Sequence, residues 1–217
     1  MKRSIWIIVA PLLALAAACS SAMHSSASSP GPTQSGAPRT PAELAAANHG
    51  HPPFVAADVN FMSGMIGHHA QAVLMASWAP THGASPAVQR LCERIGVAQT
   101  DEIKFMQTWL RDRNQEVPPA DPRGHVMPGM GPMLMPGMLT PEQMKQLDAA
   151  RGVEFDRLFL TFMIQHHRGA LTMVETLLGS YGAAQDEAVY KFSSDVTADQ
   201  STEIERMNLM LAALPTR

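Results

Sequence analysis

A pair of adjacent histidines occurs twice in this chain, each time inside the same longer pattern. The first copy consists of Asp58, Phe61, Met65, Ile66, His68, His69, Ala72 and Met75. The second copy, at a constant offset, consists of Asp156, Phe159, Met163, Ile164, His166, His167, Ala170 and Met173. A block containing Gln99, Glu102 and Met106 also repeats, at nearly the same offset, as Gln200, Glu203 and Met207. A duplicated unit of two segments is therefore the main constraint on the fold.

Apolar residues recur at helical spacings in four segments, at about residues 56–79, 86–113, 140–179 and 184–213. Gly152 is expected to break or bend the third segment. Because each two-helix unit alone could bury only one face, the two hairpins should pack together about a pseudo-twofold axis. We predict an all-α four-helix bundle over residues 55–213, with repeat one at 55–113, a methionine-rich loop at 114–139 and repeat two at 140–213. The two His-His helices should lie near one another.

The N-terminal residues 1–18 have the features of an export signal peptide: Lys2 and Arg3 precede an apolar run that ends in small residues directly before Cys19. The run is shorter than the ~20 residues that a membrane-spanning helix needs. Small residues before Cys19 predict a bacterial lipoprotein anchored only through this cysteine, in the periplasm or at the cell surface. Ala16 replaces the usual leucine of the lipoprotein box, and plain secretion is the alternative.

Residues 19–54 are rich in Ser, Pro, Gly and Ala, which predicts a disordered tether with a short helix after Thr40. The full chain has 16 Lys and Arg against 19 Asp and Glu, and loss of the signal removes two of the cations. Nucleic acid is therefore not an expected partner. Cys92 has no counterpart in the second repeat and is interpreted as a core residue. A di-iron centre would need Glu-x-x-His pairs, which the chain lacks, and no catalytic residue or enzymatic activity is predicted.

Metal binding is the chemistry that the repeated pattern favours. On a helix, Asp58, Met62, Met65 and His69 share one stripe, and His68 flanks it. Imidazole combined with thioether suits copper as Cu(I) or Cu(II), while zinc on histidines and carboxylates is the weaker alternative. The predicted metal residues are His68, His69, His166, His167, Met62, Met65, Met163, Asp58 and Asp156. The polar residues Gln99, Glu102, Gln200 and Glu203 should form either a plain polar face or acceptors that orient the imidazoles.

The loop between the repeats is rich in methionine. Its potential accessory metal residues are His125, Met127, Met130, Met133, Met135 and Met138. Interleaved Pro and Gly exclude a continuous helix and predict a surface loop. Exposed thioethers there could carry copper to or from the helices, or the loop could simply pack on the bundle or on a partner.

The segment 65–72 (Met-Ile-Gly-His-His-Ala-Gln-Ala), the segment 155–170 and the Thr-Pro-Glu-Gln-Met run at 140–144 resemble the exported bacterial family called domain of unknown function 305. The resemblance covers about residues 55–213. It implies a ferritin-like helical bundle outside the cytoplasm, with some members linked to copper binding or tolerance. The residues that match the family's motif are His68, His69, His166, His167, Met65 and Met163.

The leading hypothesis is an extracytoplasmic protein that sequesters copper or delivers it to a copper-handling partner protein. One alternative is a metal-independent helical interaction or scaffold module, in which the histidines hold the helix register. A second alternative is a copper-dependent redox enzyme. The sequence leaves the oligomeric state open.

Overall fold

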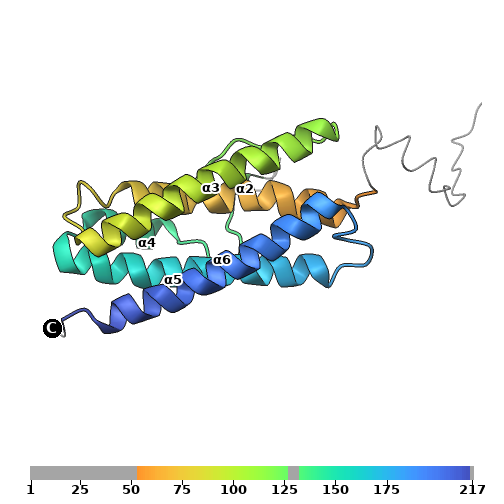
Figure 1. Cartoon of the computed structure of the whole chain (residues 1–217). Coiled ribbons are helices and arrows are strands. Elements are labelled where there is room, and N and C mark those ends of the chain that lie inside the picture. Colours follow the sequence, from red (N-terminus) through yellow and green to blue (C-terminus); the bar gives the residue numbers. More distant parts are fainter. Residues whose placement is uncertain (1–52, 127–131, 216–217) are drawn as a thin grey trace, which may run out of the picture. The chain divides into compact units, whose positions relative to one another are not determined.

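The computed structural model describes residues 53–126 and 132–215. Its long helices are α2 (Ala56–Ser77), α3 (Pro86–Asp112), α5 (Gly152–Leu178) and α6 (Glu187–Ala212), and a short helix α4 (Pro141–Ala149) precedes α5 (Figure 1). Between α3 and α4, β1 (His125–Val126) pairs antiparallel with β2 (Pro132–Met133) in a two-residue ladder that the sequence did not predict. The predicted all-α fold is confirmed. The signal peptide, Cys19, the tether and the helix after Thr40 lie outside the described residues.

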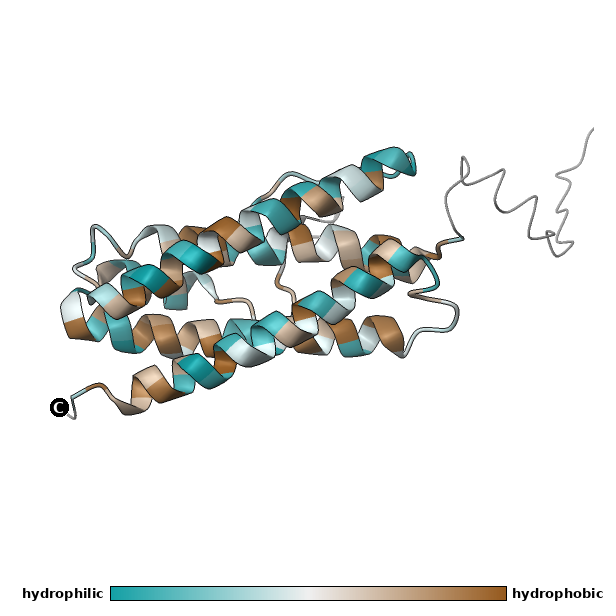
Figure 2. Ribbon diagram, in the orientation of Figure 1, coloured by the Kyte–Doolittle hydropathy of each residue, from teal (hydrophilic) through white to brown (hydrophobic). Residues whose placement is uncertain are grey.

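The two hairpins of the bundle correspond to the two sequence repeats. α3 packs on α2, α6 packs on α5, and the hairpins meet through α2 and α5 (Figure 1). In Figure 2, hydrophilic and hydrophobic stretches alternate along α3 and α6, as expected for helices with one buried face. No helix in the described part of the chain has the length and apolarity of a membrane span.

Capping residues define where several helices begin. Ser85 Oγ accepts a hydrogen bond from Val88 N–H at the start of α3. Thr140 and Gln143 form a reciprocal capping box at the start of α4, and the Asp186 carboxylate accepts backbone N–H groups at the start of α6. These side chains satisfy donors that have no partner within the helix.

The predicted third segment forms two helices, α4 and α5, and the chain breaks at Gly152 as the sequence predicts. Ala150 and Arg151 are extended, and Gly152 has a φ of 58°, a left-handed conformation that glycine adopts without strain. Gly152 N–H donates to the carbonyl of His82, in the turn between α2 and α3, at 2.8 Å. This hydrogen bond joins the first part of repeat two to the turn between the helices of repeat one.

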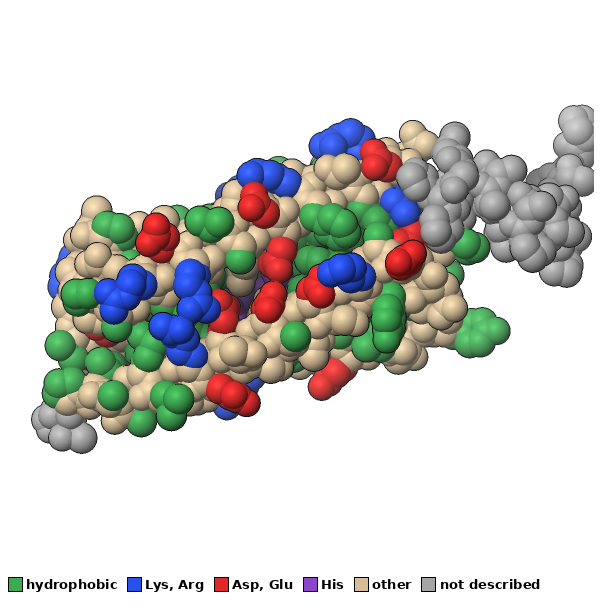
Figure 3. Space-filling view, in the orientation of Figure 1, with side chains coloured by type: hydrophobic (Ala, Val, Ile, Leu, Met, Phe, Trp, Pro, Cys, Tyr) green, Lys and Arg blue, Asp and Glu red, His purple; other side chains and the backbone are tan. Residues whose placement is uncertain are grey.

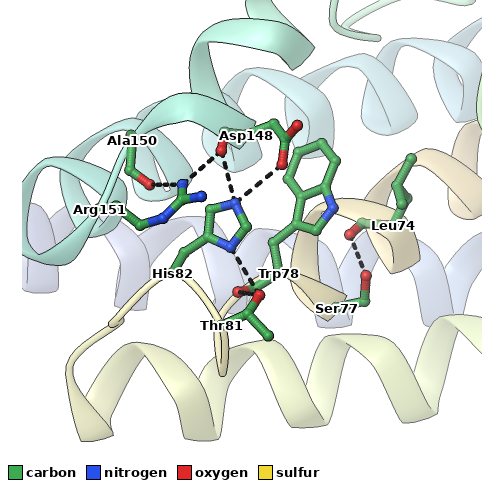
Figure 4. Close-up of polar contacts among 8 residues, drawn as sticks. All are labelled: Leu74, Ser77, Trp78, Thr81, His82, Asp148, Ala150 and Arg151. Atoms are coloured by element: carbon green, nitrogen blue, oxygen red, sulfur yellow. Dashed lines mark hydrogen bonds and ion pairs between the residues drawn. The ribbon is translucent and has the colours of Figure 1, made fainter.

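His82 completes this junction (Figure 4). Its Nε2 lies 2.8 Å from the Asp148 carbonyl oxygen and 3.1 Å from Asp148 Oδ1, and its Nδ1 lies 2.9 Å from Thr81 Oγ1. The ring stacks on Trp78 with centroids 5.8 Å apart. Arg151 donates to the same carbonyl of Asp148 from the other side. The contacts of His82 are therefore structural, and it stands apart from the paired histidines.

Candidate metal site

The paired histidines lie in the middle of the bundle, between two apolar clusters. All four side chains, His68 and His69 on α2 and His166 and His167 on α5, are fully buried. The rings of His68 and His166 approach to 3.8 Å between centroids, whereas adjacent rings on one helix are 6.3 Å apart. The packing of α2 on α5 therefore brings together the imidazoles of both repeats, as the duplicated pattern predicts.

Oxygen atoms face one nitrogen of three of these rings. His68 Nε2 lies 3.0 Å from the carbonyl oxygen of Pro136, and His167 Nε2 lies 2.7 Å from Glu203 Oε2. Because a carbonyl oxygen only accepts, the hydrogen of the neutral His68 ring lies on Nε2, and a carboxylate favours the same tautomer in His167. The Nδ1 atoms of both rings keep a lone pair and have no partner among the described atoms.

The other two histidines have fewer partners. His69 Nε2 is 2.8 Å from Glu102 Oε2, although without the alignment of a hydrogen bond, and its Nδ1 has no partner in the described structure. Neither ring nitrogen of His166 has a hydrogen-bond partner among the described residues. A buried polar atom without a partner costs about 1–3 kcal/mol. The centre therefore has an unmet capacity to bind a ligand through imidazole nitrogen.

Burial also keeps two of the imidazoles, His68 and His166, neutral. It lowers the pKa of His68 to about 3, with a smaller contribution from the neighbouring His69. Burial likewise lowers the pKa of His166 well below its ordinary value, and repulsion among protonated rings of His166, His68 and His167 lowers it further. Neutral imidazoles have a lone pair for a metal ion, so the electrostatics of the centre favour coordination at neutral pH.

Thioether groups accompany the histidines. Met62, Met65 and Met163 are fully buried, and Met65 and Met163 lie one helical turn before His69 and His167. No three His, Cys, Asp or Glu side chains of residues 53–126 and 132–215 converge as a preformed metal site. Imidazole nitrogen together with thioether sulfur is a donor set that fits copper better than zinc.

The two repeated aspartates do not belong to this centre. Asp58 lies eleven residues before His69, about 16 Å along the helix, and its oxygens accept the N–H groups of Val55 and Ala184 at 2.8 and 2.7 Å. Asp156 accepts the N–H of Ser85 at 3.1 and 3.2 Å. Each aspartate thus binds the backbone of the opposite repeat. Their predicted role as metal ligands is corrected to a structural one.

Part of the loop between α3 and α4, residues 132–140, lies across α2 and α5 beside the histidines; we call it the strap. Pro136 supplies the carbonyl that faces His68. Gln71 Nε2 donates to the carbonyls of Pro122 and Leu139, and Leu139 N–H donates to Gln71 Oε1. At Gly169 of α5, a Cβ atom would lie only 1.9 Å from the Pro136 oxygen, so only glycine allows this approach.

In the strap, methionines pack on the bundle, which is the second of the two alternatives that the sequence left open. Met138 is buried, with 4% exposure, and Met135 is half-buried against the apolar cluster of Phe61. His125 and Met133 pair in the β1–β2 ladder. Met127 and Met130 lie outside the described residues. The close approach of the strap to α5 explains why Met138 packs inward.

A groove between α3 and α6 leads from the surface toward the histidines. Its cavity has a volume of about 560 Å³, and its lining includes Gln99, Glu102, Asp199, Gln200 and Glu203. Figure 3 shows acidic side chains gathered along this groove and a histidine visible at its floor. Burial raises the pKa of Asp199, and the charges of Glu102 and Glu203 raise it further. The polar residues of the second repeated block thus separate the histidines from solvent.

Sequence reasoning missed Gln71, Pro136 and Gly169, although the repeats contain a signal for two of them. Gly67 and Gln71 of repeat one stand at the positions of Gln165 and Gly169 in repeat two. The order of glycine and glutamine is thus reversed. Gln165 Nε2 donates to the carbonyl of the strap residue 137, just as Gln71 holds other strap residues. This break in the symmetry marks where one loop crosses both helices.

The fold and this centre define a class: an all-helical bundle of two matched hairpins with four histidines buried where the hairpins meet. The chain belongs to the DUF305 family, a domain of unknown function, whose sequence pattern matches residues 58–211. No curated protein matches the chain.

Several solved structures are similar to this chain. A candidate secreted DUF305 protein from Streptomyces coelicolor is 29% identical, with a TM-score of 0.61, over 72% of this chain and 92% of that one. A DUF305 fragment from Deinococcus radiodurans shares the fold at 24% identity, with a TM-score of 0.63, over 75% of this chain and 100% of the fragment. CopM in its Cu(I)-bound form is 28% identical, with a TM-score of 0.54, over 70% of this chain and 94% of that chain.

Proposed function

We propose that this protein binds copper outside the cytoplasm and either sequesters it or hands it to a copper-handling partner protein. The observation that carries the proposal is the set of four fully buried imidazoles whose Nδ1 atoms have no partner in the described structure. The similar protein CopM has structures in Cu(I)-bound, Cu(II)-bound and Ag-bound forms, which supports the assignment to copper.

The surroundings of the rings support coordination through Nδ1. In metal sites, a histidine commonly donates its second ring N–H to a carboxylate or a backbone carbonyl, which fixes the tautomer and the ring orientation. Glu203 and the Pro136 carbonyl stand in that position for His167 and His68, and Glu102 lies beside His69. Copper would then be held by the side chains of His68, His69, His166, His167, Met65 and Met163. Thioether favours the monovalent ion, and imidazole accepts either oxidation state.

Because the histidine centre is buried, storage or transfer of copper fits it better than catalysis on a substrate does. The four imidazoles have no solvent-exposed surface, so an ion can reach them more readily than an organic substrate can. The predicted signal peptide and Cys19 support export and a lipid anchor, and the secreted candidate from Streptomyces coelicolor is consistent with an extracytoplasmic location. We propose no catalytic residue.

Copper titration tests the proposal. Wild-type protein and His68→Ala/His166→Ala should be titrated with Cu(I) against a chromogenic chelator, with folding checked by circular dichroism. We expect the double variant to lose the tightly bound copper, because it lacks the two rings that meet between the repeats. The matched control is His82→Ala, which removes a buried histidine outside the centre and should retain copper. Equal copper content in all three proteins would refute the assignment.

One observation favours the metal-independent alternative: histidines 68 and 167 already bond to other parts of the bundle. If the imidazoles only hold helix register, His68→Ala/His166→Ala should lower the melting temperature equally with and without copper. The copper proposal instead requires that copper raise the melting temperature of wild type and leave that of the double variant unchanged.

A further inference from the structure

We propose that the groove between α3 and α6 is a second cation site, which binds a hydrated divalent ion through oxygen ligands. The ligands are the carboxylates of Glu102 and Glu203 and the amide oxygens of Gln99 and Gln200. The inference goes beyond copper binding, and it does not depend on what the histidines bind.

The four residues form two matched pairs. Gln99 and Glu102 lie three residues apart on α3, and Gln200 and Glu203 have the same spacing on α6, so each helix presents one amide and one carboxylate on one face. All four line the same cavity of about 560 Å³. The pseudo-twofold relation of the repeats thus places four oxygen-bearing side chains around one space.

Unpartnered amide oxygens distinguish this groove from an ordinary acidic surface. Gln99 and Gln200 are each only 3% exposed, and the Oε1 atom of each has no hydrogen-bond partner among the described atoms. A buried acceptor left in this state is costly. A cation or its bound water would satisfy both oxygens at once. Their burial beside carboxylates therefore indicates a ligand of positive charge.

The charge around the cavity is predominantly negative. Glu102, Glu203 and Asp199 line it together with Glu93, whereas Arg94 is the cationic residue of the lining. Arg94 Nη2 is 3.8 Å from Glu203 Oε1, beyond hydrogen-bonding distance, and its side chain is 54% exposed. Arg94 can therefore move toward solvent when a metal ion enters.

The donor set selects the class of ion. Carboxylate, amide carbonyl and water are the ligands of Mg²⁺, Ca²⁺ and Mn²⁺. A six-coordinate ion that takes two carboxylates and two amide oxygens would take its remaining ligands from water. Glu102 and Glu203 also touch His69 and His167 on their inner side. The oxygen site thus lies between solvent and the imidazoles, on the route by which an ion reaches them.

The test uses Mn²⁺ as the probe, because free Mn²⁺ gives an electron paramagnetic resonance signal that disappears on binding. The mature protein should be titrated beside Glu102→Gln/Glu203→Gln. We expect saturable binding by wild type and a loss of affinity of about tenfold or more in the variant, since affinity at such sites follows the ligand charge. The charge-matched control Asp101→Asn/Glu205→Gln, at exposed positions of the same helices, should bind like wild type. Arg94→Gln should bind more tightly.

Two further variants keep the test decisive. Gln99→Met/Gln200→Met retains both carboxylates and similar side-chain volume, so weaker Mn²⁺ binding there would identify the amide oxygens as ligands. His68→Ala/His166→Ala lacks the proposed copper ligands and should still bind Mn²⁺, which separates a failure of this proposal from a failure of the copper proposal. Absence of saturable binding by wild type, or equal binding by Glu102→Gln/Glu203→Gln and its control, would overturn the inference.

Discussion

Replacement of Asp58 by alanine tests whether the repeated aspartates hold the two halves of the bundle together. The carboxylate is fully buried and accepts the N–H groups of Val55, before α2, and Ala184, before α6. Each hydrogen bond to a charged group contributes about 1.5–3 kcal/mol. Asp58→Ala should therefore lower the free energy of unfolding by about 3–6 kcal/mol. For a domain of this size, at about 2–4 °C per kcal/mol, that loss corresponds to a melting temperature about 6–24 °C lower.

The assay is thermal and urea unfolding followed by circular dichroism, in metal-free buffer and with copper. Asp101→Ala is the matched control, because Asp101 is exposed and pairs with Lys104 of its own helix. It should change stability by less than about 0.5 kcal/mol. Asp156→Ala should cost about 2 kcal/mol, less than Asp58→Ala, since Asp156 receives its cross-repeat hydrogen bond from one donor.

The two interpretations of Asp58 give different results. As a structural acceptor, Asp58 should contribute the same free energy with and without copper. As a metal ligand, it would matter only in the copper-loaded protein. A loss for Asp58→Ala within about 1 kcal/mol of that for Asp101→Ala, or a loss seen only with copper, would refute the structural role.

Three further predictions concern the strap, the buried imidazoles and the lone thiol. In urea unfolding, Gly169→Ala should displace the strap and lower stability by about 2 kcal/mol or more. The control Gly96→Ala, which has open space around its Cβ, should be neutral or stabilise α3 by up to about 1 kcal/mol. In metal-free protein, the unfolded chain takes up protons below about pH 6.5 that buried His68, with a pKa of about 3, does not. Stability should therefore fall by about 1.4 kcal/mol per pH unit as the pH drops from 6.5 toward 3, and His166 should add to the fall because its pKa is also lowered. His68→Phe/His166→Phe should make this fall less steep. Burial raises the pKa of Cys92 to about 12. In a chain that lacks Cys19, the native protein should therefore react with a thiol reagent at pH 8 at least about a hundredfold more slowly than the urea-unfolded protein.

Much of the bundle could be predicted because the pattern that specifies it is local and repeated. Helical spacing of apolar residues predicts α2, α3, α5 and α6, and the duplication predicts their pairing as hairpins. The meeting of His68 and His166 follows, since two related hairpins bury their matching faces against each other. Gly152 marks the break between α4 and α5 in the sequence. The hydrogen bond from its N–H to the carbonyl of His82 could not be predicted, because His82 belongs to the other repeat.

The errors concern groups whose partners are distant in the sequence. A helical stripe places Asp58 and His69 on one face, but it says nothing of the Ala184 N–H at the far end of the chain. Composition left open whether the methionine loop is exposed or packs on the bundle, because the approach of Pro136 to Gly169 joins residues that are distant in the sequence. The backbone carbonyl that fixes the His68 tautomer has no side-chain signature in the sequence.

The side chain of Gln71 has a consequence for how this protein can change. Its amide nitrogen bonds to both Pro122 and Leu139, so one residue closes the intervening segment into a loop with joined ends. The entropy of closing such a loop grows slowly with length, and doubling the length costs only about 0.6 kcal/mol. Insertions between these two points that leave the strap residues 132–140 in place should therefore leave the bundle nearly as stable as before. Methionines added outside the strap can vary in number independently of the scaffold to which this segment is attached.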